Sequence, residues 1–242
     1  MNGLMRFVVA LTWVPCAALG GQREGGDEAW SFKLTPAWYR TTGEKGATDI
    51  NLRANLGDHV LWIGRYDRGR EFTQTRTGYE YAVAMPFGKL VPSLQIASRG
   101  FVGGSLNAEV GRAHFLLLGL GRTNTRDYYN LNFDPNDSAL YGIGTRAFAG
   151  SVISLCTIRD NRLHTEQRVN HLVWRTSPED SHRWTVDLFA KRGRPSAGED
   201  TVAGTGGSVT YDFGAYFARL ARDPKVNFTR GDMTRVALGV RF

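Results

Sequence analysis

Residues 233–242 read MTRVALGVRF, and two kinds of side chain alternate along this stretch. One face would carry Thr234, Val236, Leu238, Val240 and Phe242, and the other Arg235 and Arg241. Successive side chains of a β-strand point to opposite faces, so a period of two indicates a strand. The stretch therefore predicts a strand with one apolar face and one basic face.

The same alternation recurs from residue 30 onward. Residues 30–40 place Trp30, Phe32 and Trp38 opposite Lys33 and Tyr39, and segments 49–57 and 182–191 repeat the scheme. These segments are about 9 to 12 residues long, which suits a tilted strand that crosses a bilayer. No stretch approaches the roughly 18 apolar residues of a spanning helix. The pattern therefore predicts an all-β membrane protein.

Turn residues divide the chain into fourteen segments, or twelve if weak ones merge. The predicted strands are 30–41, 49–57, 59–68, 72–85, 89–98, 100–111, 113–122, 138–149, 151–159, 166–176, 182–192, 206–213, 214–222 and 231–242. Short connections alternate mostly with longer ones, of which the longest are 123–137 and 194–205. A sheet in a bilayer must close on itself to pair every backbone group. We therefore expect a transmembrane antiparallel up-and-down β-barrel of 12–14 strands.

Composition agrees with one barrel domain. Hydrophobic residues make up 42% and charged residues 22% of the 242 positions, and mean hydropathy is slightly negative. A membrane barrel keeps such averages because lipid-facing and lumen-facing residues alternate. The 29 glycines and 12% aromatic residues suit turns and interfacial girdles. No shift in composition divides the chain, so we expect a single barrel domain over residues 30–242.

The first residues have the pattern of a secretory signal peptide. Arg6 supplies a positive start, residues 7–14 an apolar stretch, and residues 18–20 a small-residue cleavage site. We therefore expect residues 1–20 to be a cleaved signal peptide. Residues 21–29 would then form a short N-terminal segment in the periplasm, ahead of the barrel.

The last strand, ending on Phe242, resembles the C-terminal strand of bacterial outer-membrane β-barrel proteins. This resemblance implies location in the Gram-negative outer membrane and recognition of Phe242 by the barrel-assembly machinery. It points to a class that contains pores, enzymes, adhesins and structural proteins, and to no family of known activity. The formal charge of +7 suggests an anion-attracting lumen or contact with outer-membrane lipid and lipopolysaccharide, with no sign of nucleic-acid binding.

The polar strand faces collect charged side chains that would line the lumen. The selectivity candidates are Lys33, Arg53, Arg65, Arg76, Glu80, Arg146, Asp187, Arg235 and Arg241, and Lys89, Glu109, Lys191 and Asp212 share their faces. These residues form either a salt-bridged interior plug or, in an open lumen, walls that favour anions. The sequence favours a passive, porin-like channel for small, anionic solutes. A lipid-modifying enzyme and a structural barrel without transport remain alternatives.

Two further stretches are candidates for chemistry. The oxygen-rich loop at residues 126–138, bounded by Asp127 and Asp137, could bind calcium, pack as an external loop or fold inward as a constriction. The pair Asn170-His171 is the best catalytic candidate, but no Gly-x-Ser-x-Gly motif accompanies it. No cofactor, phosphate-loop or zinc motif is present. We therefore assign no catalytic residue, no metal and no cofactor.

Overall fold

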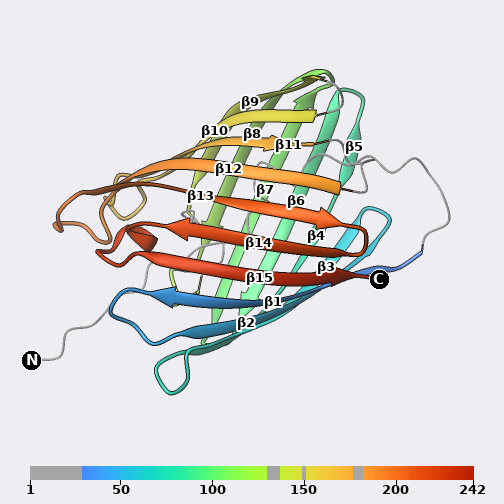
Figure 1. Cartoon of the computed structure of the whole chain (residues 1–242). Coiled ribbons are helices and arrows are strands. Elements are labelled where there is room, and N and C mark those ends of the chain that lie inside the picture. Colours follow the sequence, from blue (N-terminus) through green and yellow to red (C-terminus); the bar gives the residue numbers. More distant parts are fainter. Residues whose placement is uncertain (1–28, 130–136, 149–150, 177–181) are drawn as a thin grey trace, which may run out of the picture.

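The computed structural model describes residues 29–129, 137–148, 151–176 and 182–242, and they form an all-β structure (Figure 1). The predicted signal peptide, and nearly all of the predicted segment 21–29, lie outside these residues. The strands are β1 (Ser31–Thr41), β2 (Ala47–Leu56), β3 (His59–Asp67), β4 (Thr73–Tyr81), β5 (Val83–Met85), β6 (Gly88–Ala97), β7 (Phe101–Gly111), β8 (His114–Thr123), β9 (Ala139–Phe148), β10 (Ser151–Asp160), β11 (Gln167–Arg175), β12 (His182–Gly193), β13 (Val202–Phe213), β14 (Tyr216–Asp223) and β15 (Met233–Arg241). A single 3-10 turn, η1 (Val226–Phe228), precedes β15. No helix among the described residues is long and apolar enough to cross a membrane.

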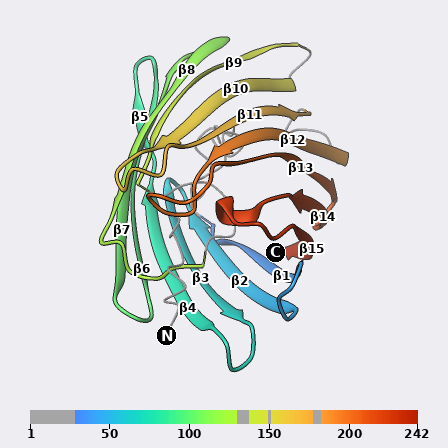
Figure 2. The same cartoon turned by 90° about the vertical axis from the view of Figure 1, so that its left-hand side faces the viewer.

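The sheet closes into an antiparallel up-and-down barrel. Strands that follow one another in the chain pair with each other except β4 and β5, which both pair with β6, and β1 pairs with β15. β4 and β5 act as one strand with an irregularity at Ala82, so fourteen strands cross the wall. Figure 2 shows the strands curving around a common interior. The predicted fold class is confirmed, with fourteen strands rather than twelve.

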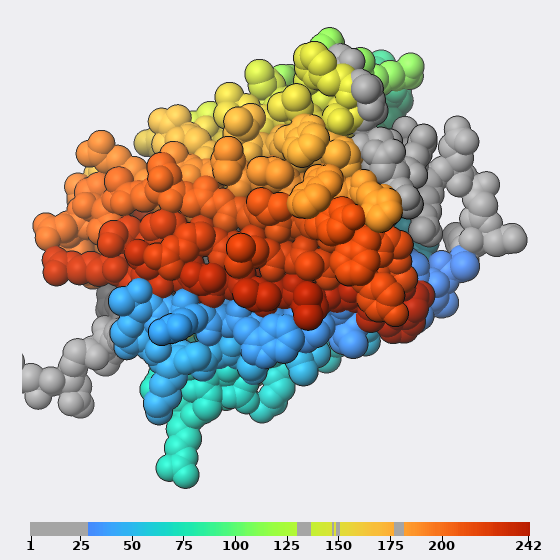
Figure 3. Space-filling model, in the orientation of Figure 1, coloured from blue at the N-terminus to red at the C-terminus, as the bar shows by residue number. Residues whose placement is uncertain are grey.

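The seam between β1 and β15 joins the two ends of the sheet. Phe32 N–H donates to Phe242 O at 2.7 Å, and Phe242 N–H donates to Phe32 O at 3.0 Å. The two rings also stack, with centroids 5.5 Å apart. Figure 3 shows the red C-terminal strands lying directly against the blue N-terminal ones. Phe242 thus completes the backbone ladder at the seam, which leaves no unpaired strand edge there.

The outer wall is an apolar band with aromatic residues at one end. Large aliphatic side chains face outward and are exposed along its middle, among them Ile50, Leu94, Leu118, Ile143, Leu188 and Leu238. Aromatic stacks lie near one rim: Trp30–Phe32–Phe242, His59 with Tyr79 and Tyr81, and Trp184–Tyr211–Phe213–Tyr216. Such a band with an aromatic girdle is how a barrel contacts hydrocarbon and the interface.

The two ends of the barrel differ in their connections. The end that carries the aromatic stacks also holds Ala29 and Phe242 and two-residue turns at 57–58, 86–87, 112–113 and 214–215. Gly57 and Gly214 take positive φ, +53° and +60°, which the tight hairpins at 57–58 and 214–215 require. The other end carries the longer connections, including 124–138, 194–201 and 224–232. We call these the short-turn end and the loop end.

Most predicted strand boundaries lie within a few residues of the observed ones. The largest difference is at β13, which was predicted to begin at 206 and begins at Val202. Residues 202–205 were assigned to the preceding loop, whereas Gly206 was correctly placed in the strand. A Cβ at Gly206 would collide with the Phe189 ring and the Arg222 carbonyl. Gly206 is therefore a strand residue whose missing side chain admits the ring of Phe189 from the neighbouring strand.

Candidate functional site

The barrel interior collects most of the predicted lumen residues. The side chains of Lys33, Arg53, Arg76, Glu80, Arg146, Asp187, Arg235 and Arg241 all belong to the inward series of their strands. Arg76 is only 1% exposed, and Glu80 and Arg235 are also buried. Their placement agrees with the period-two reading of each strand. Their role in selectivity stays a prediction.

Arg65 does not face the lumen, so its predicted placement is wrong. In β3 the buried inward residues are Trp62, Gly64 and Tyr66, and Arg65 shares the outer face with Leu61 and Ile63. Its side chain is 63% exposed and lies 4.0 Å from Asp67. Near a strand end an arginine can extend its stem along apolar surface and place its charge beyond it. Polarity alone therefore assigned it to the wrong face.

Ion pairs between strands stabilise the interior. Arg53 Nη2 lies 3.0 Å from Glu80 Oε2, and His171 Nδ1 lies 2.9 Å from Asp187 Oδ1. Four further pairs are Arg76–Asp49, Arg146–Glu109, Lys191–Asp223 and Arg241–Asp212. Sequence reasoning did not single out Asp49 or Asp223. Strand alternation could have placed both side chains inward, but it could not have indicated their partners.

Cations outnumber anions among the inward strand positions that the structure describes. The inward cations are Lys33, Arg53, Arg76, Lys89, Arg146, Arg175, Arg183, Lys191, Arg219, Arg235 and Arg241. The inward carboxylates are Asp49, Glu80, Glu109, Asp160, Asp187, Asp212 and Asp223. Pairing therefore neutralises only part of the interior, and a positive excess remains.

That excess concentrates near the short-turn end. Arg53, Lys33 and Arg241 face one another directly across β2, β1 and β15. Like charges at opposing positions destabilise a sheet. Among the described residues no carboxylate pairs with Lys33, whose Nζ lies 4.5 Å from the ring centroid of Phe217. The row therefore contains one cation, Lys33, that no described carboxylate contacts directly.

Neighbouring strands extend this positive surface. Arg183 Nη2 lies 3.7 Å from Asp212, which also pairs with Arg241, and Arg219 Nε donates to Thr210 Oγ1 at 2.7 Å. We define Lys33, Arg53, Arg183, Arg219 and Arg241 as the basic vestibule. The side chains of Arg53, Arg183 and Arg241 are between 29% and 33% exposed although they face inward. Water therefore reaches this part of the interior.

The loop-end half of the interior is packed instead with aromatic rings. Tyr66 and Tyr129 stack with centroids 3.5 Å apart, and Tyr39 meets Tyr129 edge-on at 5.9 Å. Phe72 and Met233 complete this buried cluster. We call these five residues the aromatic plug. Tyr129 comes from the long loop between β8 and β9, so this loop turns into the barrel.

Side chains of β4 hold the loop in that position. Gln74 Nε2 donates to Asp127 O at 2.8 Å, and Tyr129 N–H donates to Gln74 Oε1 at 2.7 Å. Arg76 Nη1 donates to Tyr129 O at 3.0 Å. Tyr128 stacks on Phe101 at 4.3 Å, and burial raises the pKa of Tyr128 to about 12. The hypothesis of an inward fold is confirmed for Tyr128 and Tyr129, which are buried, whereas residues 124–127 are exposed and 130–136 lie outside the described residues.

The far end of the same loop is fastened through Asp137. Its carboxylate accepts hydrogen bonds from Thr123 N–H at 3.0 Å and from Arg162 Nη1 at 2.7 Å. Across the described part of the chain, no three His, Cys, Asp or Glu side chains gather as a metal site would require. One of the two acidic residues named for calcium is thus engaged in holding the loop.

His171, the best catalytic candidate, also faces the interior. It is buried, its Nδ1 contacts Asp187, and its ring lies 5.6 Å from that of Phe189. A lipid-modifying enzyme needs its histidine accessible from the membrane surface. The position of His171 fits a packed interior pair better than such a site.

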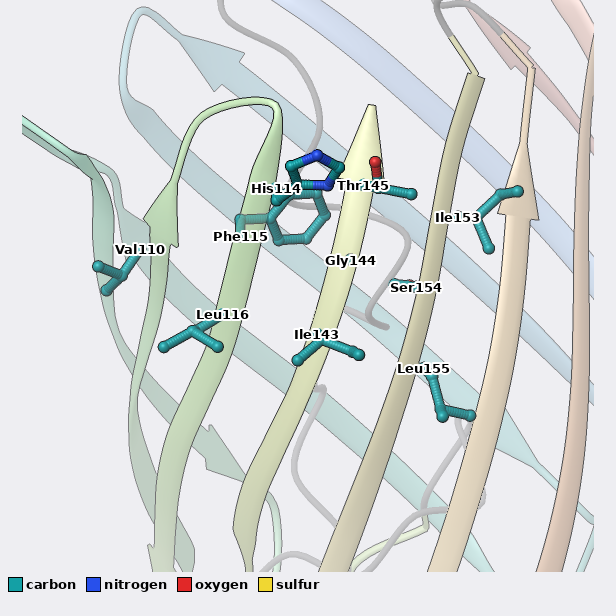
Figure 4. Close-up of a pocket in the computed structure, with 10 residues that line it drawn as sticks. All are labelled: Val110, His114, Phe115, Leu116, Ile143, Gly144, Thr145, Ile153, Ser154 and Leu155. Carbon is teal, nitrogen blue, oxygen red and sulfur yellow. The ribbon is translucent and has the colours of Figure 1, made fainter. Parts of the chain in front are cut away.

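A hollow on the outer wall lies near the short-turn end (Figure 4). Half of its lining residues are aliphatic: Val110, Leu116, Ile143, Ile153 and Leu155. β9 carries Gly144 at this level, and the inward ring of Phe115 occupies the space that a Cβ would take on the other side of the wall. This apolar hollow faces the hydrocarbon layer and contributes nothing to the interior site.

No protein-family model and no curated protein sequence matches the chain. Solved structures do match. Outer membrane protein Omp33 of Acinetobacter baumannii superimposes with a TM-score of 0.59 at 8% identity, over 88% of this chain and 98% of that one. The likeness establishes the fold. OccAB3 of the same organism matches with a TM-score of 0.44 at 6% identity, over 89% of this chain and 99% of that one.

Proposed function

We propose that this protein is a passive channel of the Gram-negative outer membrane that favours small anionic solutes. The apolar outer band, the aromatic girdle and the closed backbone ladder support a membrane location. The fold shared with Omp33, an outer membrane protein, supports the outer membrane in particular. The short-turn end then faces the periplasm after removal of residues 1–20, and the loops face outward.

The observation that carries the proposal is the basic vestibule. Its cations are inward, and Arg53, Arg183 and Arg241 are partly accessible to water. Lys33 has no carboxylate partner among the described residues. Low-dielectric walls focus the field of such charges into the lumen, which raises the local concentration of anions. An anion that reaches Lys33 also meets the two arginines on either side of it, Arg53 and Arg241. The same positive field repels cations of similar size.

The aromatic plug and the anchored loop set the size limit. Together they occupy the loop-end half of the lumen on the side of β1, β3 and β4. Solutes must pass the space that these groups leave, so the channel suits small molecules. The same loop is the natural place for changes in conductance, because a single side chain, Gln74, holds two of its backbone groups.

Assembly would use the last strand. Phe242 is exposed on the outer wall and stacks on Phe32 at the seam, where β15 must meet β1 for closure. Recognition of this strand by the barrel-assembly machinery would cover the unpaired backbone edge of β15 until it pairs with β1.

Solute flux into liposomes tests the proposal. Purified protein should admit gluconate faster than a cation of similar size, and Lys33→Gln combined with Arg53→Gln should remove the preference, because Glu80 is then left without its cation. Arg222→Gln changes an outward arginine and serves as the matched control. Retention of folded, heat-modifiable migration on SDS gels shows that each variant is a barrel. Equal flux of both ions through the folded wild-type protein would refute anion preference.

A further inference from the structure

Outward arginines gather at the loop end of the outer wall. They are Arg40, Arg65, Arg122, Arg159, Arg168, Arg192 and Arg222. In the described strands no outward lysine or arginine lies near the short-turn end. This asymmetry matches a membrane whose two leaflets differ in charge.

Three of these arginines form a row across neighbouring strands. Arg159 of β10 lies opposite Arg168 of β11, which lies opposite Arg192 of β12. All three are exposed, and Arg168 Nε donates to Asn170 Oδ1 at 3.0 Å. None of the three pairs with a carboxylate in the described part of the chain, whereas Arg222 pairs with Asp232 at 3.0 Å. We call them the arginine row.

The row is an unfavourable arrangement by itself. Like charges directly opposite each other destabilise a sheet, and here two such pairs share Arg168. A bound anion removes this repulsion. Guanidinium groups donate parallel hydrogen bonds that fit phosphate oxygens, so phosphate is the anion that such a row recognises best.

The wall below the row is arranged for an acyl chain. Leu155, Leu172 and Leu188 lie in register on the same three strands, and they are 53%, 46% and 54% exposed. Each leucine is four residues from the arginine of its own strand, on the same face. Four residues span about 13 Å of strand. Charge and apolar surface are therefore spaced as in a phosphorylated amphiphile.

We propose that the arginine row binds the phosphate groups of lipopolysaccharide, with its acyl chains against the leucines. The choice of lipid uses the proposed outer-membrane location, in which the loop end reaches the outer leaflet. A soluble phosphate would gain nothing from the leucine surface. The site lies on the outside of the wall and is separate from the basic vestibule.

Binding of purified lipid A to the refolded barrel in detergent tests this site, measured by native mass spectrometry. The triple variant Arg159→Gln, Arg168→Gln, Arg192→Gln should bind bis-phosphorylated lipid A at least tenfold more weakly than wild type. A second triple variant, Arg40→Gln, Arg65→Gln, Arg222→Gln, removes as many outward loop-end charges elsewhere and should bind within twofold of wild type. Dephosphorylated lipid A with the same acyl chains should bind wild type as weakly as it binds the first variant.

Several outcomes would overturn the site. Equal losses in the two triple variants would mean diffuse charge attraction, and equal binding of the dephosphorylated lipid would mean acyl contact alone. Tighter binding of phosphatidylglycerol than of lipid A would assign the row to a glycerophospholipid instead. Anion preference measured on the same preparations should be unchanged by the first variant. If the wild-type barrel conducts no ions, the proposed channel function is rejected. The lipid A measurement still decides whether the arginine row binds phosphate.

Discussion

Replacing Gln74 with alanine should release the inward loop. Gln74 is fully buried, and its amide both donates to Asp127 O and accepts from Tyr129 N–H. Its Nε2 also donates to Ser98 O at 3.2 Å. Alanine offers none of these contacts, so two backbone groups of the loop lose their partner while the loop stays inside. Water can form hydrogen bonds with these two backbone groups only if the loop moves out of the barrel interior.

The size of the effect follows from those two groups. A buried donor or acceptor without a partner costs about 1–3 kcal/mol. Tyr129 N–H is buried and Asp127 O is partly buried, so together their loss shifts the equilibrium toward the released loop by about 2–4 kcal/mol. Since 1.4 kcal/mol is a factor of ten, the occupancy of the released state should rise by roughly 30- to 1,000-fold until it saturates.

Single-channel recording in a planar bilayer measures this release. Gln74→Ala should show a larger conductance step or a longer open time than wild type at the same voltage. Gln167→Ala is the matched control, because Gln167 is a buried inward glutamine that holds Arg194 O in a different loop. If both variants conduct like wild type, the loop is not the constriction, and the reasoning from the Gln74 contacts fails.

Three other perturbations have defined outcomes. Lys191→Met should lower the free energy of unfolding in guanidinium by about 3–5 kcal/mol, because it leaves Asp223 charged and buried, whereas Lys45→Met at an exposed pair should change it by less than about 1 kcal/mol. Deleting Phe242 should lower the amount of folded barrel in outer-membrane fractions, and unchanged amounts would contradict its role at the seam. Conductance should not respond to the loop tyrosines below pH 10, since a released Tyr128 titrates near 10 and the anchored one at about 12. At a pH between those two values, deprotonation of Tyr128 favours the released loop, so conductance should rise by pH 11. A flat profile would count against an anchored loop in the lumen.

The fold was predictable because one rule applies along the whole chain. Alternation at residues 233–242, 30–40 and 182–191 indicated strands, and the positions of turn residues indicated fourteen of them, or twelve if weak segments merged. The rule failed at two places. Residues 202–205 were assigned to a loop although they open β13, and Arg65 was placed inward because its charge was weighed without its position near a strand end.

The contents of the lumen were predictable only in part. Alternation gave the inward face of Arg76 and Lys191, but their partners Asp49 and Asp223 depend on which strands become neighbours and in which register. The anchoring role of Gln74 was invisible for the same reason. Its partners lie more than fifty residues away in a loop whose path is set by the plug. The sequence therefore predicts which side chains face the lumen, whereas their partners depend on tertiary contacts.

The reversal potential across a planar bilayer in a KCl gradient tests the central claim most directly. A channel lined by the basic vestibule should pass chloride in preference to potassium, and the preference should weaken in about 1 M salt, where the screening length falls to roughly 3 Å. The double variant Lys33→Gln, Arg53→Gln should move the reversal potential toward the equilibrium potential of potassium. A folded barrel that prefers potassium, or that conducts no ions at any voltage, would contradict the account.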